Sequence, residues 1–313
     1  MPPVPDGSGS AISRVICFDY ADEDYLTIAY EAYLKRSKLP KYNGIFFPTS
    51  YILTGNASAH GWTLIEKTTA ALTKKQLPWT PLGNAAAAKA SYPVLSGPLA
   101  SPNFTGYCND QAGWVDSSKA VSQLHDDCLE LGVSFICGRA EILVGLDTDS
   151  QNYIKAVQTL AGTSILGDHS VLASGAWTSG LVKMSNSALS TAQNTETPEM
   201  AVHGWAYTRA PTLEDHQTIM GKNRLRQGLR EILPELADRD FITDFHPGYK
   251  NLFVGSGANR LFSAFKFLPV LGDYIFLALT KRLPQHLAQK WRFQTDRGGP
   301  ARRELYAQEK AKL

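Results

Sequence analysis

The sequence has little charge and no long apolar run. Only 19% of its 313 residues are charged, the net charge is +2, and no basic stripe is interleaved with aromatics, so we expect no nucleic-acid partner. The most apolar segment, Phe267 to Leu279, is short and contains Asp273, which predicts no membrane span. Residues 1–14 lack the apolar core of a secretory signal, so we do not expect secretion.

Cysteine is scarce as well, and none of it has CxxC spacing. The four cysteines are Cys17, Cys108, Cys128 and Cys137. This pattern argues against a structural zinc site and suits a reducing compartment. His125, Asp126 and Asp127 are adjacent residues of a predicted helix and point in different directions, so we expect no metal site there.

With 43% apolar residues, the chain can bury a large core in one or two domains. Acidic residues before an apolar periodic segment predict a helix from Tyr25 to Lys35, followed by a strand within residues 42–54. Residues 116–138 read as a helix capped by Asp116 and leading directly into a buried strand, "VSFICG".

The second half of the chain is richer in strand patterns. Strand-like runs at 140–149, 152–162 and 164–177 predict a β-meander, and the segment near 185–200 reads as loop. A strand at 200–209, a long helix from Thr212, a strand-turn-strand unit at 241–257 and a terminal helix follow. The mixture predicts an α/β protein with two lobes interleaved in sequence.

Two strands run directly into small residues, at 174–177 and at 255–257. Glycine turns of this kind let a backbone approach a planar or phosphorylated ligand closely. The alternative is a tight turn that binds nothing, because short glycine patterns are common. The sequence leaves both interpretations open for each turn.

Four segments together carry a family resemblance: "DQAGWVDSSKAV" (110–121), "VLASGAW" (171–177), "DFITDFHPGYKNLFVGSG" (240–257) and "FKFLPVLGD" (265–273). They resemble the fungal FAD-dependent amine oxidases, which include sarcosine oxidase, L-pipecolate and saccharopine oxidases and the fructosyl amino acid oxidases (amadoriases). The resemblance implies an α+β two-lobed fold, in which an incomplete Rossmann-like FAD-binding lobe is interleaved with an antiparallel-sheet substrate lobe.

The resemblance also implies domain boundaries within one FAD-dependent oxidoreductase domain over residues 1–313. The FAD lobe would comprise residues 1–36, 110–182 and 240–290. The substrate lobe would comprise residues 37–109 and 194–238, and residues 291–313 would form a C-terminal tail.

The implied reaction is oxidation of a secondary amine of an amino acid by FAD and molecular oxygen, with release of hydrogen peroxide. Lys266 matches the family lysine that holds the substrate carboxylate, a role for a compact cation, and His203 matches a substrate-side histidine. Lys266 could instead be a surface lysine at a helix end, and His203 could be a strand histidine with satisfied hydrogen bonds.

FAD is expected to bind without a covalent link, because the family's flavin-linking cysteine strand has no counterpart after Cys137. The resemblance assigns the flavin the following residues: Arg14, Ser174, Gly175, Ala176, Trp177, Gly255, Ser256, Gly257, Phe265 and Lys266.

The chain departs from the family pattern in several places. The G-x-G-x-x-G unit expected before Met1 is absent, so the chain reads as shortened. Further gaps fall between Gln193 and Met200 and near Asp238, and Glu199 stands where the family has a lysine that activates oxygen. Two alternatives therefore remain: a catalytically inactive remnant that acts at most as a binding module, and an unrelated α/β binding module.

The last three residues, Ala311, Lys312 and Leu313, are close to the SKL address for peroxisomes. They predict recognition by the peroxisomal import receptor and a peroxisomal location, with the cytoplasm as the alternative.

Overall fold

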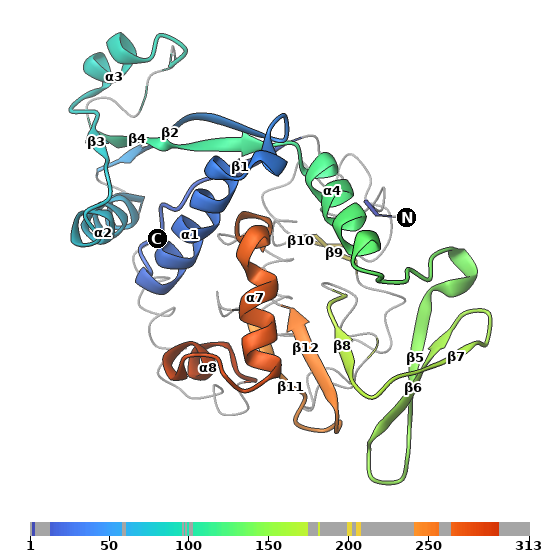
Figure 1. Cartoon of the computed structure of the whole chain (residues 1–313). Coiled ribbons are helices and arrows are strands. Elements are labelled where there is room, and N and C mark those ends of the chain that lie inside the picture. The colour runs from blue at the N-terminus through green and yellow to red at the C-terminus, as the bar shows by residue number, and fades with distance from the viewer. Residues whose placement is uncertain are drawn as a thin grey trace. The chain divides into compact units, whose positions relative to one another are not determined.

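The computed structural model describes residues 2–3, 13–57, 61–95, 97, 99, 103–174, 181, 199–201, 205–207, 241–256 and 264–293. The chain forms two compact units, each assembled from two stretches of sequence. Unit 1 comprises residues 1–135 and 264–272, and unit 2 comprises residues 136–263 and 273–313. The elements are helices and mainly antiparallel sheets (Figure 1), so the predicted mixed α/β class is confirmed, whereas the predicted lobe boundaries stay a prediction.

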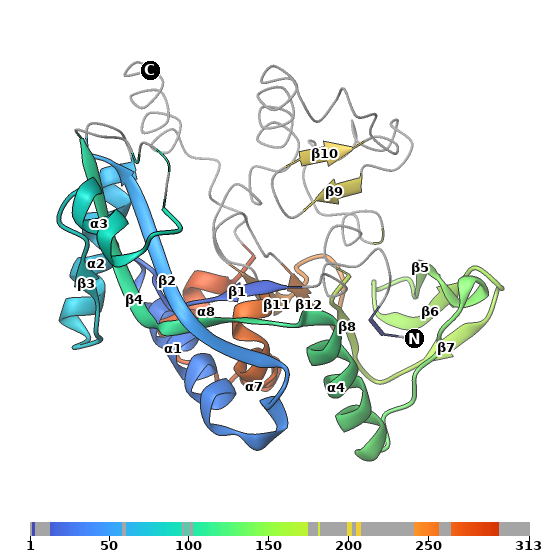
Figure 2. The same cartoon turned by 90° about the horizontal axis from the view of Figure 1, so that it is seen from above.

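Unit 1 is organised around one antiparallel sheet. Its strands are β1 (Arg14–Ile16), β2 (Phe46–Asn56), β3 (Thr80–Pro81) and β4 (Phe104–Val115). Its complete helices are α1 (Glu23–Lys38), α2 (Gly61–Lys74), α3 (Ala85–Ser91) and α4 (Ser117–Glu130). Strand β4 lies between β1 and β2 and also pairs with β3; the long β2 and β4 run side by side (Figure 2).

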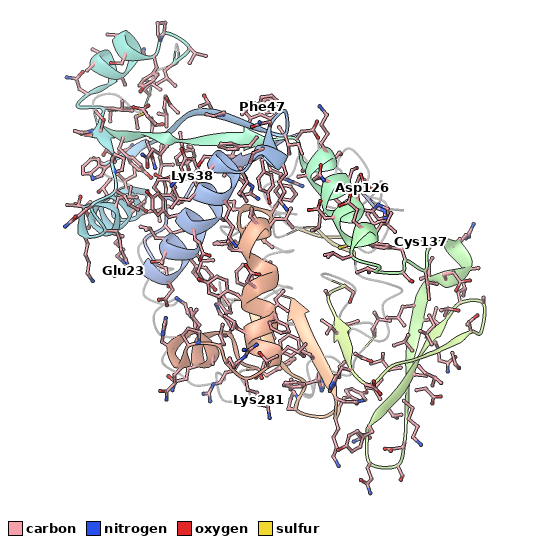
Figure 3. All side chains as sticks on the ribbon, viewed as in Figure 1. Glu23, Lys38, Phe47, Asp126, Cys137 and Lys281 are labelled. Carbon is pink, nitrogen blue, oxygen red and sulfur yellow. The ribbon has the colours of Figure 1, made fainter. Side chains whose placement is uncertain are left out.

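Helix α1 confirms the predicted helix and extends it at both ends. The side chain of Asp22 caps it by accepting hydrogen bonds from the backbone N–H groups of Asp24 and Tyr25, at 3.1 and 3.2 Å. Figure 3 labels Glu23 and Lys38, its acidic and basic terminal residues. Acidic residues in the first turn and basic residues in the last complement the helix dipole.

Helix α4 is confirmed, but the buried strand predicted at 133–138 is wrong. Asp116 caps the helix through the backbone N–H of Lys119 at 3.0 Å. At the other end, the N–H of Val133 bonds back to the carbonyl of Cys128 at 2.9 Å. The following residues form no strand and are mostly exposed, including Cys137 (Figure 3). An apolar run becomes a strand only where a neighbouring strand accepts its backbone groups, and this segment has no such pairing.

The described residues of unit 2 form three small sheets. An antiparallel meander contains β5 (Leu143–Thr148), β6 (Ile154–Thr159) and β7 (Ser164–Leu166). A hairpin contains β9 (Glu199–Ala201) and β10 (Trp205–Tyr207). The third sheet has the order β11 (Ile242–Phe245), β12 (Leu252–Ser256) and β8 (Ser170–Leu172). The last two elements are α7 (Leu268–Leu279), which begins in unit 1 and ends in unit 2, and α8 (Gln285–Trp291).

The predicted meander is confirmed as β5, β6 and β7. The prediction is wrong for the second half of the run at 164–177. Residues 164–177 do not continue as one strand, because β8 leaves the meander and pairs in parallel with β12, with Leu172 opposite Val254. The core of this region explains the change of partner. Ile154, Leu172, Leu252 and Val254 form one buried cluster, and β8 contributes Leu172 to it only by lying against β12.

The predicted strand-turn-strand unit at 241–257 is confirmed as β11 and β12, which pair antiparallel. His246 shapes the turn: its Nδ1 accepts hydrogen bonds from the N–H groups of Gly248 and Tyr249 at 3.0 and 3.2 Å. The helix predicted from Thr212 lies outside the described residues. None of the helices in the described part of the chain combines the length and apolar composition of a membrane span.

Candidate functional site

Lys266 lies in a short 3₁₀ turn, Ala264–Phe267, that leads into α7. Its side chain is half-buried, and its Nζ donates a hydrogen bond to the Sγ of Cys17 at 3.1 Å. The same ammonium lies 5.3 Å from the centroid of the Tyr20 ring, within the range of a cation–π interaction. Lys266 is therefore enclosed by the segment that follows β1, not free at a helix end.

Cys17 faces Lys266 as a neutral thiol. The side chain is only 3% exposed, and burial raises its pKa, although the Lys266 charge acts in the opposite direction. A thiol in this state is a weak hydrogen-bond partner for the ammonium.

Asp19 adds a carboxyl group to the same cluster. Both of its oxygens accept hydrogen bonds from Nδ2 of Asn109, at 3.2 and 3.1 Å, and Asn109 is fully buried in β4. Burial raises the pKa of Asp19, while Asn109 and the Lys266 charge hold it down. The cluster thus contains one cation and one carboxyl whose ionised form is disfavoured by its surroundings.

Phenol groups complete the cluster. Burial raises the pKa of Tyr20, Tyr51 and Tyr107, and the neighbouring Asp19 charge raises each of them further. All three stay protonated and can donate a hydrogen bond. The ring of Tyr20 also stacks on Phe267 at 5.7 Å between centroids.

This cluster can bind an anion but holds no ionised nucleophile. A half-buried ammonium near neutral phenols suits a carboxylate ligand. The sequence motifs predict Lys266 as a site residue but do not predict Cys17, Asp19 or Tyr20. The segment "CFDY" directly after a short strand was the available signal, but only the fold brings it to a lysine almost 250 positions later.

Arg14 is also a predicted flavin residue of unit 1. It lies in β1 opposite Val115 of β4. Its side chain is half-buried. Phe265 precedes Lys266 in the 3₁₀ turn and packs against the cluster of Ile16, Ile45, Phe46, Val115 and Ala120. The flavin contacts of Arg14 and Phe265 stay predictions.

Strands β8 and β12 are parallel and adjacent, so their carboxyl ends lie at the same edge of the third sheet. Ser174 comes two residues after β8, and Gly255 and Ser256 are the last two residues of β12. Ligands of α/β folds bind outside the carboxyl ends of parallel strands. A Cβ added at Gly255 would meet its nearest atom, Cδ1 of Ile275, only at 3.8 Å, so packing alone does not require glycine at this position.

The remaining predicted site residues fall outside the described part of the chain. They are Gly175, Ala176, Trp177, His203, Gly257, Ala311, Lys312 and Leu313. Of the described ones, Arg14, Phe265 and Lys266 belong to unit 1, whereas Ser174, Gly255 and Ser256 belong to unit 2. No group of three or more metal-ligating side chains occurs within the described residues.

Comparison with known proteins gives a consistent result. No family model matches the chain. L-saccharopine oxidase of Schizosaccharomyces pombe is 24% identical in an alignment that covers 94% of this chain and 86% of the relative. The resemblance to the FAD-dependent amine oxidase family is confirmed.

Solved structures of this family share the fold. A modified fructosyl peptide oxidase from Aspergillus nidulans, solved in complex with FSA, has a TM-score of 0.70 at 17% identity, covering 95% of this chain and 86% of that chain. The fructosamine oxidase Amadoriase II from Aspergillus fumigatus has a TM-score of 0.66 at 18% identity, covering 94% and 82%. The alignment with saccharopine oxidase spans 375 positions, more than the chain has residues, so this relative has segments without a counterpart here.

Proposed function

We propose that the chain is an FAD-dependent oxidoreductase that oxidises the secondary amine of an amino acid and releases hydrogen peroxide. The observation that carries the proposal is Lys266, a half-buried cation held between the thiol of Cys17 and the ring of Tyr20. A cation in this setting recognises a carboxylate, which every amino acid substrate supplies.

The residues around Lys266 have defined parts in this proposal. Lys266 binds the substrate carboxylate and fixes the orientation of the amine-bearing carbon. Asp19 is a nearby carboxyl whose ionised form burial disfavours, so it adds little repulsion toward a carboxylate bound at Lys266. His203 would lie on the substrate side.

FAD, when bound, supplies the electron acceptor and passes the electrons on to oxygen. Its fit can be judged at the edge formed by β8 and β12, where Ser174, Gly255 and Ser256 lie at the carboxyl ends of adjacent parallel strands. Backbone N–H groups and hydroxyls at such an edge suit a phosphate-bearing cofactor. The family resemblance assigns Gly175, Ala176, Trp177, Gly257, Arg14 and Phe265 to the flavin as well.

The decisive experiment is reconstitution. Purified protein is mixed with FAD, freed of unbound cofactor by gel filtration, and examined for bound flavin absorbance. We expect a yellow protein that forms peroxide with at least one of sarcosine, L-pipecolate, saccharopine and fructosyl amino acids. Protein that remains colourless after this treatment would refute the oxidase function and favour a binding module.

A second proposal concerns location. We propose that Ala311, Lys312 and Leu313 direct the chain to peroxisomes, a compartment suited to an enzyme that forms peroxide. A fluorescent reporter carrying the last residues of the chain should accumulate in peroxisomes. The same reporter ending in Ala311 is the control, and a diffuse signal from both reporters would contradict the proposal.

A further inference from the structure

Arg36 connects helix α1 to the turn that carries Lys266. The residue is only 3% exposed. Its guanidinium donates from Nη1 to the backbone carbonyl of Lys266 and from Nη2 to the carbonyl of Phe265. The guanidinium also lies 5.7 Å from the centroid of the Phe265 ring. One buried side chain therefore holds two consecutive peptide groups of the 3₁₀ turn.

The sequence of the turn limits its backbone hydrogen bonds. In an α-helix, the carbonyl of Phe265 would accept a hydrogen bond from the backbone N–H four residues later. That position is Pro269, which has no N–H, and the turn is a 3₁₀ helix instead. The Nη2 group of Arg36 gives this carbonyl a charged donor from outside the turn.

Charge and shape make arginine suitable for this contact. Burial lowers the pKa of Arg36 to about 10, so the side chain stays charged at neutral pH. Its planar fork presents two donors in a fixed relation, which a lysine cannot do. Hydrogen bonds from a charged donor are stronger than neutral ones.

We propose that Arg36 is a positioning residue for Lys266: its two hydrogen bonds fix the peptide groups from which the Lys266 side chain starts. The importance of this contact for substrate rests on the proposed function, in which Lys266 binds a carboxylate. The contact itself does not depend on that function.

The first test measures the Lys266 amine directly in the full chain. Acetic anhydride is added in short pulses, and acetylation of Lys266 is followed by peptide mass spectrometry. Arg36→Met should raise its acetylation rate about tenfold, equivalent to one charged hydrogen bond, and Arg36→Lys should have a smaller effect. Lys38→Met, which changes an exposed residue of the same helix, is the matched control and should have none.

An unchanged Lys266 rate in both Arg36 variants would overturn the proposal. Acetylation of Lys41 and Lys74, which belong to exposed ion pairs, reports general loosening, because unfolding would accelerate these lysines as well. If Arg36→Met does not fold, Arg36→Lys decides alone, since it retains the charge but loses the fork. If Arg36→Lys raises the acetylation rate of Lys266 but not that of Lys41 or Lys74, the result supports positioning.

The second test is a double-mutant cycle with acetate as the carboxylate probe, measured by isothermal titration. Arg36→Met should weaken acetate binding about tenfold in the parent chain and have no effect in Lys266→Met. Equal losses in both backgrounds would indicate a merely structural role and overturn the proposal. If the parent chain binds no acetate while the acetylation result holds, positioning is supported and the carboxylate function of Lys266 fails.

Discussion

The Lys266 cluster of unit 1 and the edge of β8 and β12 in unit 2 contain different chemical groups. The Lys266 cluster places one cation among a thiol, phenols and a carboxyl, and burial raises the pKa of each of these groups. The edge of the parallel strands carries the small residues Ser174, Gly255 and Ser256 instead. A charged cluster selects ligands by charge, whereas a backbone edge selects them by shape and by the phosphates they carry.

The two regions also differ in how they are supported. Lys266 depends on contacts from distant segments, with Cys17 and Tyr20 after β1 and Arg36 on α1. The edge of β8 and β12 depends on the apolar cluster beneath it, which includes Leu172 and Leu252. Substitutions should therefore affect them through different mechanisms.

The largest effect is expected from removing the support of the edge. Leu252 is fully buried in β12, and Leu252→Ala should lower the free energy of unfolding by about 3 kcal/mol because it leaves a cavity. Val171→Ala on the adjacent strand is the matched control, since Val171 is 50% exposed. Urea unfolding followed by circular dichroism measures both, and equal effects would contradict a core role for Leu252.

The next effect concerns the charge of the Lys266 cluster. Lys266→Met keeps much of the apolar stem but removes the ammonium, and it should weaken binding of a carboxylate substrate about thirtyfold, the equivalent of a lost charged hydrogen bond. Lys74→Met, at a lysine that is 68% exposed, should have no effect. The Michaelis constant for the amino acid is the measurement, and an unchanged value in Lys266→Met would refute the assignment.

Two glycines separate packing from recognition. A Cβ at Gly113 in β4 would lie 2.5 Å from the carbonyl oxygen of Phe47, so Gly113→Ala should cost about 2 kcal/mol of stability. Gly255→Ala meets no such contact and should change stability by less than about 0.5 kcal/mol. If Gly255 lies against the cofactor, the added Cβ should hold FAD away from the backbone and weaken its binding about tenfold. Equal FAD affinity would leave Gly255 as a strand residue of β12 that does not contact the cofactor.

The smallest expected effect concerns stability: the contributions of Asp19 in unit 1 and His246 in unit 2 should depend on pH in opposite directions. Burial raises the pKa of Asp19 above 3.8, so its favourable contribution is complete below that pH and is lost as pH rises through the raised pKa. Burial lowers the pKa of His246 below 6.5, so its contribution is complete above that pH and is lost as pH falls through the lowered pKa.

Two asparagine variants test this contrast. Asp19→Asn should gain stability relative to the parent chain as pH rises toward neutrality. His246→Asn retains an acceptor for the turn and should reduce the loss of stability on acidification. Urea unfolding across a pH series gives both slopes, and parallel curves for the parent and both variants would contradict the assignment.

Local sequence signals predicted most elements correctly. Caps such as Asp22 and Asp116 act within one helical turn, and alternating apolar residues defined β11 and β12, so neither depends on distant segments. The strand predicted at 133–138 failed because strand formation needs a partner that the local pattern does not specify. The prediction of one strand over 164–177 failed for the same reason, because the pairing of β8 with β12 is not specified by the local pattern.

By itself, the sequence determined the α/β class and the family resemblance and singled out Lys266 as a candidate, because these depend on composition, spacing and short motifs. Only the tertiary structure decided what surrounds Lys266. Cys17, Tyr20 and Arg36 are separated from it by more than 200 positions, and no periodicity of the chain encodes that distance. Such contacts arise where packing brings β1, α1 and the turn before α7 together, and burial there alters the pKa of Cys17 and Asp19.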